Sequence, residues 1–343
     1  MTGHGAPAVP GRAPAALDRR VRRLLRWYPR SWRARYGEEF AELLLAELSE
    51  QPRAWRRTAN VARCGIAARL ASAGLSGHYA ERTAGARACL GTLTCSVAVF
   101  LTFGITMWAQ LAVGWQWAPP ANPATAVAML VMSASLLFLA VLALLATVPA
   151  VWTAVLACRR GQAPSLRRPA LLIGAGVLTL VLGGRHFGNG WPGTGGHWWP
   201  HQGLAPGGLA AFGWASTLSV TSYWVHPAAL ASFPPAELAW MAISPAAMLS
   251  LAIGAVQLVR RLELPSPVLR FEAWVGRAAT ADMTAFLGGA LCWVAQDGPA
   301  SHGLFRAGSI DAAGLAVMAV ALATGWQAIS RARPIPPHAA GHR

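Results

Sequence analysis

Four histidines lie between residues 185 and 236, and two of them have a spacing that suits a metal ion. His197 and His201 are four residues apart, which would put both imidazoles on one face of a helix. Glycines at 195 and 196 and a proline at 200 disfavour a helix there. No Cys, Asp or Glu lies between 185 and 236 to complete a ligand set. We therefore expect all four side chains to be solvated or interfacial, without a bound metal: His186, His197, His201 and His226.

Acidic side chains beside apolar segments are the second candidate for chemistry, because an ionisable group at membrane depth is costly and usually functional. Glu237 and Asp311 fall close to predicted helix N-termini, where a carboxylate accepts hydrogen bonds from unpaired backbone amides and is favoured by the helix dipole. We assign capping roles to both. Asp282 is predicted to lie about one turn inside an apolar helix, where it could pair with Arg277 or a neighbouring helix, or serve a proton or ion path. It is the candidate intramembrane polar residue.

Sequence signatures of common enzymes are absent. The chain has no phosphate-binding loop, no His-Glu-x-x-His, no Gly-x-Ser-x-Gly and no glycine-rich dinucleotide fingerprint. Its five cysteines are odd in number and include no Cys-x-x-Cys pair, so a disulfide framework is not expected. We predict no cofactor and no catalysis, and keep open a membrane-embedded enzyme or metal-binding protein that uses the outer histidines or Asp282.

The composition indicates an integral membrane protein. Mean hydropathy is +0.40, 55% of residues are hydrophobic and only 12% are charged, too few to cover a soluble surface. A net charge of +16 would suggest nucleic acid if the arginines formed one face of a soluble domain. Instead, sixteen of the 29 arginines fall at or before Arg87, and most others flank long apolar runs. We therefore expect no nucleic-acid partner.

Six segments are long or apolar enough to span a hydrocarbon core of roughly 30 Å, which takes about 20 helical residues. They lie near 88–113, 125–157, 169–184, 237–258, 278–296 and 309–330. The second is too long for a perpendicular crossing and is expected to tilt or bend near Pro149. Glycine pairs in the third and fifth spans, at 174 and 176 and at 288 and 289, are expected to allow close helix approach. The predicted fold is an all-α membrane bundle over residues 86–330, with an outer loop 185–236 and a cytoplasmic tail 331–343.

The distribution of arginines predicts the orientation. With both termini in the cytoplasm, 27 arginines lie inside and only Arg185 and Arg306 lie outside, as the positive-inside rule requires. The apolar segment 207–225 is a rival span, but counting it would place eight arginines outside. We interpret it as an interfacial or re-entrant piece, with its aromatic rings in the headgroup zone. The sequence thus predicts a multi-pass protein of the cytoplasmic membrane.

An arginine-rich cytoplasmic head is predicted over residues 15–85, after a disordered tail at 1–14. Pro29 is expected to end a first helix at Tyr28 and to begin a second. The second helix carries an apolar stripe of Trp32, Tyr36, Phe40 and Leu43 or Leu44. A third amphipathic helix is expected over 53–75, with its apolar stripe at Trp55, Ala59, Ile66 and Leu70.

The most distinctive string in the head is Tyr28-Pro29-Arg30-Ser31-Trp32-Arg33-Ala34-Arg35-Tyr36-Gly37-Glu38-Glu39-Phe40. It resembles a short cytoplasmic motif that precedes the membrane portion of many bacterial multi-pass proteins. These include the prefix segments of certain ABC-transporter permeases and uncharacterised actinobacterial membrane proteins. The resemblance covers less than a tenth of the chain and implies no agreed catalytic role. The chain also departs from some of those permeases, because it has no large extracytoplasmic domain between its first two spans.

The motif combines aromatic anchors with guanidinium groups, each worth about 1 kcal/mol of attraction to anionic lipid near the surface. We treat eight of its residues as a candidate membrane-surface or partner-docking site: Tyr28, Trp32, Arg33, Arg35, Tyr36, Glu38, Glu39 and Phe40. The expected partners are the bilayer, with anionic lipids at its cytoplasmic face, and a protein that binds residues 15–50. The predicted function is an accessory, regulatory or interaction component; the alternative is a permease-like subunit that needs a separate ATPase.

Overall fold

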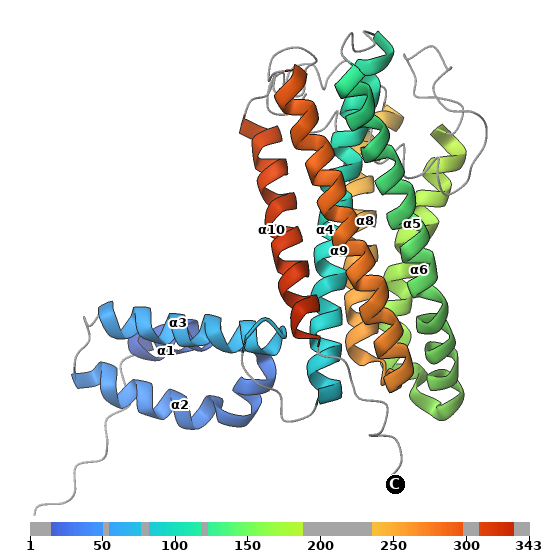
Figure 1. The fold of residues 1–343 in the computed structure, drawn as a ribbon. Coiled ribbons are helices and arrows are strands. Elements are labelled where there is room, and N and C mark those ends of the chain that lie inside the picture. The colour runs from blue at the N-terminus through green and yellow to red at the C-terminus, as the bar shows by residue number, and fades with distance from the viewer. Residues whose placement is uncertain are drawn as a thin grey trace, which may run out of the picture. The chain divides into compact units, whose positions relative to one another are not determined.

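The computed structural model describes residues 15–50, 55–76, 82–117, 123–187, 235–297 and 309–332, and all regular structure in these ranges is helical (Figure 1). The chain divides into two compact units, residues 1–79 (unit 1) and residues 80–343 (unit 2). The predicted all-α fold class is confirmed.

Unit 1 contains three helices, α1 (Ala15–Leu25), α2 (Arg30–Glu50) and α3 (Trp55–Ser72). The chain leaves α1 through a turn, in which the Trp27 and Tyr28 amides donate to the carbonyls of Leu24 and Leu25, and Pro29 then precedes α2. Helix α1 packs against both α2 and α3. Their shared core consists of Val21, Leu24, Tyr28, Leu44, Leu48 and Val61. The break at Pro29 lies where the sequence predicts it.

The apolar stripe predicted on α3 is exposed within unit 1 and does not face its core. Trp55 is 71% exposed within the structure, Ile66 44% and Leu70 42%, whereas Val61 and Gly65 are buried. The helix meets the rest of unit 1 through small side chains, so that its backbone approaches closely and its large apolar residues point away. On α2, the sequence left Leu43 and Leu44 as alternatives for the last residue of the apolar stripe. Leu44 is buried and Leu43 is 63% exposed, so Leu44 is the residue that faces the core.

Gly65 is the point of closest approach in unit 1. A Cβ atom added to it would lie 2.6 Å from the Cβ of Trp27 and 3.1 Å from the Trp27 carbonyl carbon. One turn later, Arg69 donates from Nε to the Trp27 carbonyl oxygen over 2.6 Å and from Nη2 to that of Arg26. These two carbonyls follow the last turn of α1, where no further helical amide is available to them. Arg69 therefore ties α3 to the end of α1.

The described residues of unit 2 form six long helices. They are α4 (Arg82–Trp117), α5 (Pro123–Ala157), α6 (Ala163–Phe187), α8 (Pro235–Arg261), α9 (Ser266–Asp297) and α10 (Ser309–Arg331). Five stretches of the described residues are long and apolar enough to cross a membrane, and the longest, Pro123–Gly183, contains both α5 and α6. A π-helical turn, η1 (Cys158–Gln162), joins the two, and Gly161 within it has φ of 82°. That left-handed conformation is open to glycine without strain and lets the chain reverse.

Several helices extend beyond the predicted spans. Helix α6 begins at Ala163 and continues through Arg185 to Phe187, although the predicted span is 169–184. Pro164 stands in its first turn, where a missing amide proton costs no hydrogen bond. Helix α9 begins at Ser266, twelve residues before the predicted start of its span. Apolarity limits the part of a helix that can lie in lipid, but backbone hydrogen bonding continues past it.

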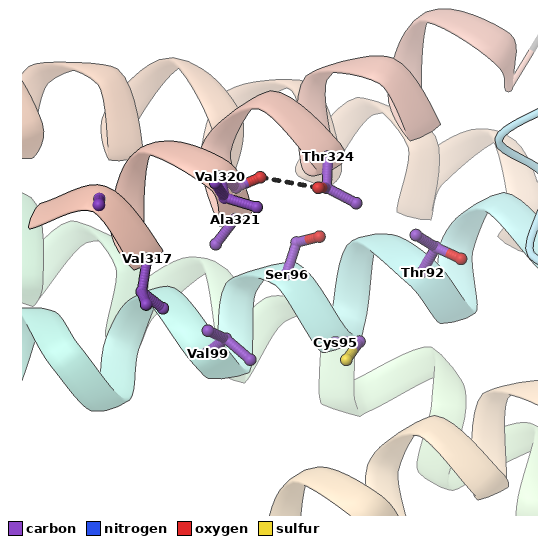
Figure 2. Close-up of a pocket in the computed structure, with 9 residues that line it drawn as sticks. Thr92, Cys95, Ser96, Val99, Val317, Val320, Ala321 and Thr324 are labelled. Atoms are coloured by element: carbon purple, nitrogen blue, oxygen red, sulfur yellow. Dashed lines mark hydrogen bonds between the residues drawn. The ribbon is translucent and has the colours of Figure 1, made fainter. Parts of the chain in front are cut away.

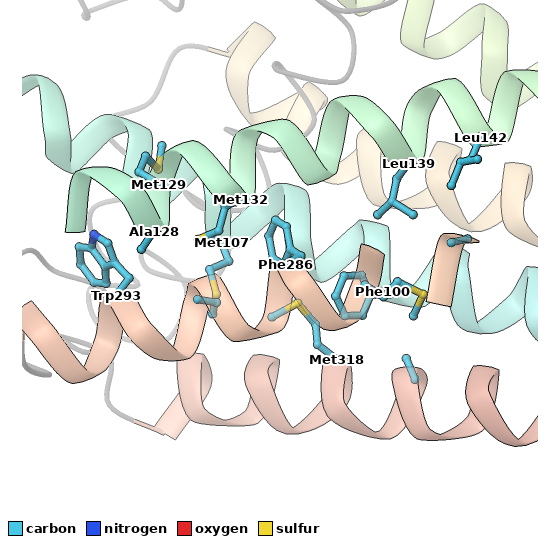
Figure 3. Close-up of a cluster of buried hydrophobic side chains, with 14 of the residues drawn as sticks. Phe100, Met107, Ala128, Met129, Met132, Leu139, Leu142, Phe286, Trp293 and Met318 are labelled. Atoms are coloured by element: carbon cyan, nitrogen blue, oxygen red, sulfur yellow. The ribbon is translucent and has the colours of Figure 1, made fainter. Parts of the chain in front are cut away.

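Helix α4 is central in unit 2 and packs against α5, α8, α9 and α10, while α5 also packs along α9 and α6 along α8 (Figure 1). The main hydrophobic core lies among α4, α5, α9 and α10 (Figure 3). In it, the rings of Phe100 and Phe286 meet edge to face with centroids 5.6 Å apart. The Trp108 indole donates to the Ser133 hydroxyl over 3.0 Å, which links α4 to α5.

Helices α6 and α8 are antiparallel and meet through glycines. A Cβ at Gly176 would lie 2.8 Å from the Ala247 carbonyl oxygen, and one at Gly254 would lie 3.1 Å from the Ile173 amide nitrogen. Gly183 likewise lies directly against the Trp240 ring. Within this contact the Ser250 hydroxyl donates to the Leu172 carbonyl over 2.9 Å. Such close backbone approach is how membrane helices gain packing energy without a hydrophobic driving force.

Of the four glycines expected to allow close approach, two do so. Gly176 meets α8, and a Cβ at Gly289 would lie 3.3 Å from the Ala128 carbonyl oxygen of α5. Gly174 and Gly288 are exposed, and a Cβ at either would meet nothing within 4 Å. The expectation is therefore confirmed for Gly176 and Gly289 and is wrong for Gly174 and Gly288.

One end of unit 2 gathers the arginines. The start of α4, the α5–α6 turn, the α8–α9 turn and the end of α10 all lie at this end of the bundle (Figure 1). The arginines at these places include Arg87, Arg159, Arg160, Arg260, Arg261 and Arg331. Because α6 and α8 are antiparallel, the last residue of α6 and the first residue of α8 lie at the opposite end. The segment 207–225 itself lies outside the described residues.

Candidate functional site

Asp282 lies near the middle of α9, sixteen residues after its first residue and fifteen before its last. At 1.5 Å per residue, it is roughly 22–24 Å from each end of the helix. The sequence predicts a position about one turn inside the span. The greater depth arises because α9 begins at Ser266, so that the stretch before the apolar segment is also helical.

The Asp282 side chain faces α5. The Ser135 hydroxyl, which is 4% exposed, lies within hydrogen-bonding range of the carboxyl. Met132 and Leu139, one turn on either side of Ser135 in α5, and Phe286, one turn after Asp282 in α9, are at most 1% exposed and belong to the main hydrophobic core (Figure 3). The Oδ2 atom of Asp282 is excluded from solvent and has no hydrogen-bond partner among the described residues. The site is therefore a carboxyl group in an apolar helix interface, with one hydroxyl beside it.

Asp282 does not pair with Arg277. The ion pairs among the described residues are Arg22–Asp18 and Arg57–Glu47, both in unit 1. Five residues correspond to about 140° around a helix, so Arg277 lies on a different face from Asp282 and is exposed. Contact with a neighbouring helix, one of the roles that the sequence suggests for Asp282, is present in the structure.

The other acidic and histidine candidates fall mostly outside the described side chains. Glu237 and Asp311 are the third residues of α8 and α10, which agrees with their predicted place in the first turn of a helix. Their side chains are outside the described part, as are those of His186, His197, His201 and His226. Among the residues that the structure does describe, no three His, Cys, Asp or Glu side chains group together as metal ligands.

The aromatic residues of the N-terminal motif build the core of unit 1. The rings of Tyr28 and Trp32 stack with centroids 4.1 Å apart, and Phe40 meets them edge on at 5.5 and 5.4 Å. Tyr28 is 5% exposed, and burial, followed by the nearby Cys64, raises the pKa of its hydroxyl, which therefore stays neutral at physiological pH. Tyr28 is thus a core residue, whereas Trp32 and Phe40 pack against that core and are half-buried.

The charged residues of the motif and Tyr36 are more accessible. Arg35, Glu38 and Glu39 are exposed, and the Arg35 guanidinium lies 5.2 Å from the centroid of the Tyr36 ring. Tyr36 itself is 40% exposed. Arg33 is half-buried, and its Nε has no hydrogen-bond partner among the described residues. The part of the predicted docking site that a partner can reach is therefore Arg35, Tyr36, Glu38 and Glu39.

Unit 1 also has an exposed apolar surface on α3. We define the α3 surface as Trp55, Ile66 and Leu70 with the exposed arginines Arg56 and Arg63. The Arg56 guanidinium lies 5.8 Å from the centroid of the Trp55 ring. The four-residue spacing was visible in the sequence, but such a stripe fits a buried face and an interfacial face equally well.

A groove of about 380 Å³ lies between α4 and α10 (Figure 2). Its lining includes Thr92, Cys95, Ser96, Val99, Val320 and Thr324. The Thr324 hydroxyl donates to the Val320 carbonyl over 2.7 Å, so its proton is already bound within α10. The lining contains no charged side chain, which suits an apolar occupant better than a polar substrate.

Comparison of the chain with known protein families, curated proteins and solved structures finds no match. The roles of Asp282, the N-terminal motif and the α3 surface are therefore argued from their own geometry.

Proposed function

We propose that this chain is a multi-pass protein of the cytoplasmic membrane that acts, without catalysis of its own, as an accessory or regulatory interaction component. The observation that carries this proposal is how the residues of the N-terminal motif divide between the core and the surface of unit 1. Its buried aromatic residues hold unit 1 together as a separate compact unit, and its charged residues with Tyr36 remain exposed. A head that folds on its own core and is joined to a membrane bundle is suited to binding other molecules.

The head offers two surfaces of different chemistry. Residues 1–79 contain fourteen arginines against six acidic residues. The exposed acidic residues cluster on α2, at Glu38, Glu39, Glu42 and Glu47, whereas α1 and α3 expose arginines. In our proposal the α3 surface, with its tryptophan and guanidinium groups, meets anionic lipid. The exposed side of α2 is then left for a protein partner.

The partner-binding side of α2 can be tested with a surface variant that leaves the core of unit 1 intact. We expect Arg35→Glu combined with Glu38→Lys and Glu39→Lys to reduce cross-linking of the full chain to its partner severalfold in native membranes, because the charge pattern is inverted. Deletion of residues 15–50 should have the same effect. Quantitative mass spectrometry of cross-linked, purified protein measures both. The matched control is a triple charge reversal on α1, Arg19→Glu, Arg22→Glu and Arg23→Glu. Cross-linked partners that are unchanged by the α2 variant and by the deletion would refute the proposal.

The proposed orientation places both termini in the cytoplasm. It is supported by the gathering of arginines at one end of unit 2, since guanidinium groups are retained on the cytoplasmic side of a membrane. We expect a reporter that is active only in the cytoplasm to work when fused after Arg343, and one active only outside to fail there. The same pair of reporters inserted in the loop after Asp297 should give the opposite result. Activity of the external reporter at the C-terminus would overturn the orientation.

A further inference from the structure

We propose that Asp282 and Ser135 form a proton-binding site in the interface between α5 and α9. The Asp282 carboxyl holds a proton while this interface is closed, and the ligand of the site is the proton itself. The site lies in unit 2 and is independent of the interactions proposed for unit 1.

The first argument is the position of the carboxyl. It lies near the middle of α9, roughly 22–24 Å from either end of that helix, where α9 packs along α5. Its Oδ2 is shielded from solvent, and the large neighbouring side chains Met132, Leu139 and Phe286 are fully buried. Water cannot stabilise a negative charge on an atom so placed.

The second argument is the absence of a counter-charge among the described residues. No charged group interacts with the carboxyl. Helix α5 contains no charged residue from Pro123 to Ala157. The charged and titratable residues of α4, α9 and α10, the other elements at this site, are Arg82, Arg87, Cys89, Cys95, Arg270, Glu272, Arg277, Cys292, Asp297, Asp311 and Arg331. The ionised form of Asp282 would therefore be a half-buried carboxylate with one oxygen shielded from solvent and no counter-charge among the described residues.

An uncompensated carboxylate in an apolar medium is so costly that the group takes up a proton instead. The step is a simple association, in which a proton from water forms an O–H bond with a carboxylate oxygen, with no redox change and no leaving group. Ser135 can accept a hydrogen bond from the new O–H group or donate one to the remaining carbonyl oxygen. One hydroxyl is enough for a neutral carboxyl, whereas a metal cation would need several more oxygen ligands.

Binding of this proton is linked to helix packing. With the proton bound, the interface between α5 and α9 contains a neutral, hydrogen-bonding group. Without it, a charge must either reach water or remain buried between the two helices. The proton-free form therefore favours a looser α5–α9 interface, which gives the bundle a means to respond to pH.

Infrared spectroscopy of the full chain in lipid vesicles tests the proposal. We expect the wild-type protein at pH 5 to show a carboxylic C=O stretching band that is absent in Asp282→Asn and retained in Asp297→Asn, the matched control on the same helix. Ser135→Ala should keep the band and shift its frequency, because the hydrogen bond is lost. Exchange of sodium for choline should leave it unchanged. A spectrum in which Asp282→Asn removes no band would overturn the proposal. Loss of the band when sodium is added would also overturn it, in favour of a cation site.

Labelling gives a second readout. Dicyclohexylcarbodiimide adds to protonated carboxyl groups in apolar surroundings. Because the chain contains no lysine, trypsin cleaves it only at arginines and releases residues 278–306, whose only acidic side chains are Asp282 and Asp297. We expect the label on Asp282 in the wild type, with less labelling as the pH rises. Modification confined to Asp297 would contradict the assignment.

Discussion

Substitution of Gly176 by valine is expected to lower the thermal stability of the membrane bundle. A Cβ at this position would lie 2.5 Å from Cγ of Leu251 and 2.8 Å from the Ala247 carbonyl oxygen. Side chains can move aside, but the carbonyl belongs to the backbone of α8, so the two helices must separate. Forcing extra atoms into a packed interface costs about 1–3 kcal/mol, and separation also strains the hydrogen bond from Ser250 to Leu172.

The matched control for this variant lies two residues away on the same helix. Gly174→Val adds the same side chain to α6, but a Cβ there meets nothing within 4 Å. Thermal unfolding of the two purified proteins in the same detergent should give a clearly lower transition temperature for Gly176→Val and a value near wild type for Gly174→Val. Equal transition temperatures would contradict the packing of α6 on α8.

Substitution of Gly65 by valine is expected to open unit 1. The added Cβ would meet both the Cβ and the backbone of Trp27, so α3 would be pushed from the end of α1. This change would also weaken the bond from Arg69 to the Trp27 carbonyl. Small domains have total stabilities of only about 5–15 kcal/mol, and a loss of about 3 kcal/mol would greatly increase the unfolded fraction of a unit this small.

Limited trypsin digestion of the full chain measures the opening of unit 1, because arginines occur along all three of its helices. We expect cleavage within residues 15–76 to be at least tenfold faster in Gly65→Val than in the wild type. Gly37→Ala is the control: a Cβ at Gly37 lies 3.6 Å from Arg33, an ordinary contact, and alanine favours a helix by about 1 kcal/mol over glycine. Digestion of Gly65→Val at the wild-type rate would show that α3 does not pack as described.

The membrane helices were predictable because lipid imposes a simple requirement. A helix that crosses it needs a long apolar run, and all six predicted spans fall entirely within helices of unit 2. The break at Pro29 was predictable for a similar reason, since proline acts on the local backbone. Both requirements depend only on residues that are close together in the sequence, so they can be predicted from the sequence alone.

Contacts between helices were harder to predict. Gly174 and Gly176 are equivalent in sequence, but only Gly176 faces α8. The stripe on α3 has the spacing of a buried face, yet Gly65 and Arg69 fix α3 with its other side inward. The depth of Asp282 depends on where α9 begins, and the contact with Ser135 depends on how α9 packs along α5. Such features are set by the partner helix, about which a single segment carries no information.

The basic residues at the arginine-rich end of unit 2 are all arginines, because the chain has no lysine. A guanidinium group does not lose its proton in proteins, and lysine acetylation has no target here. The positive charge of these side chains is therefore permanent. Neither acid, base nor acylating enzymes can neutralise it, so the difference in charge between the two ends of the bundle does not depend on pH or on lysine modification.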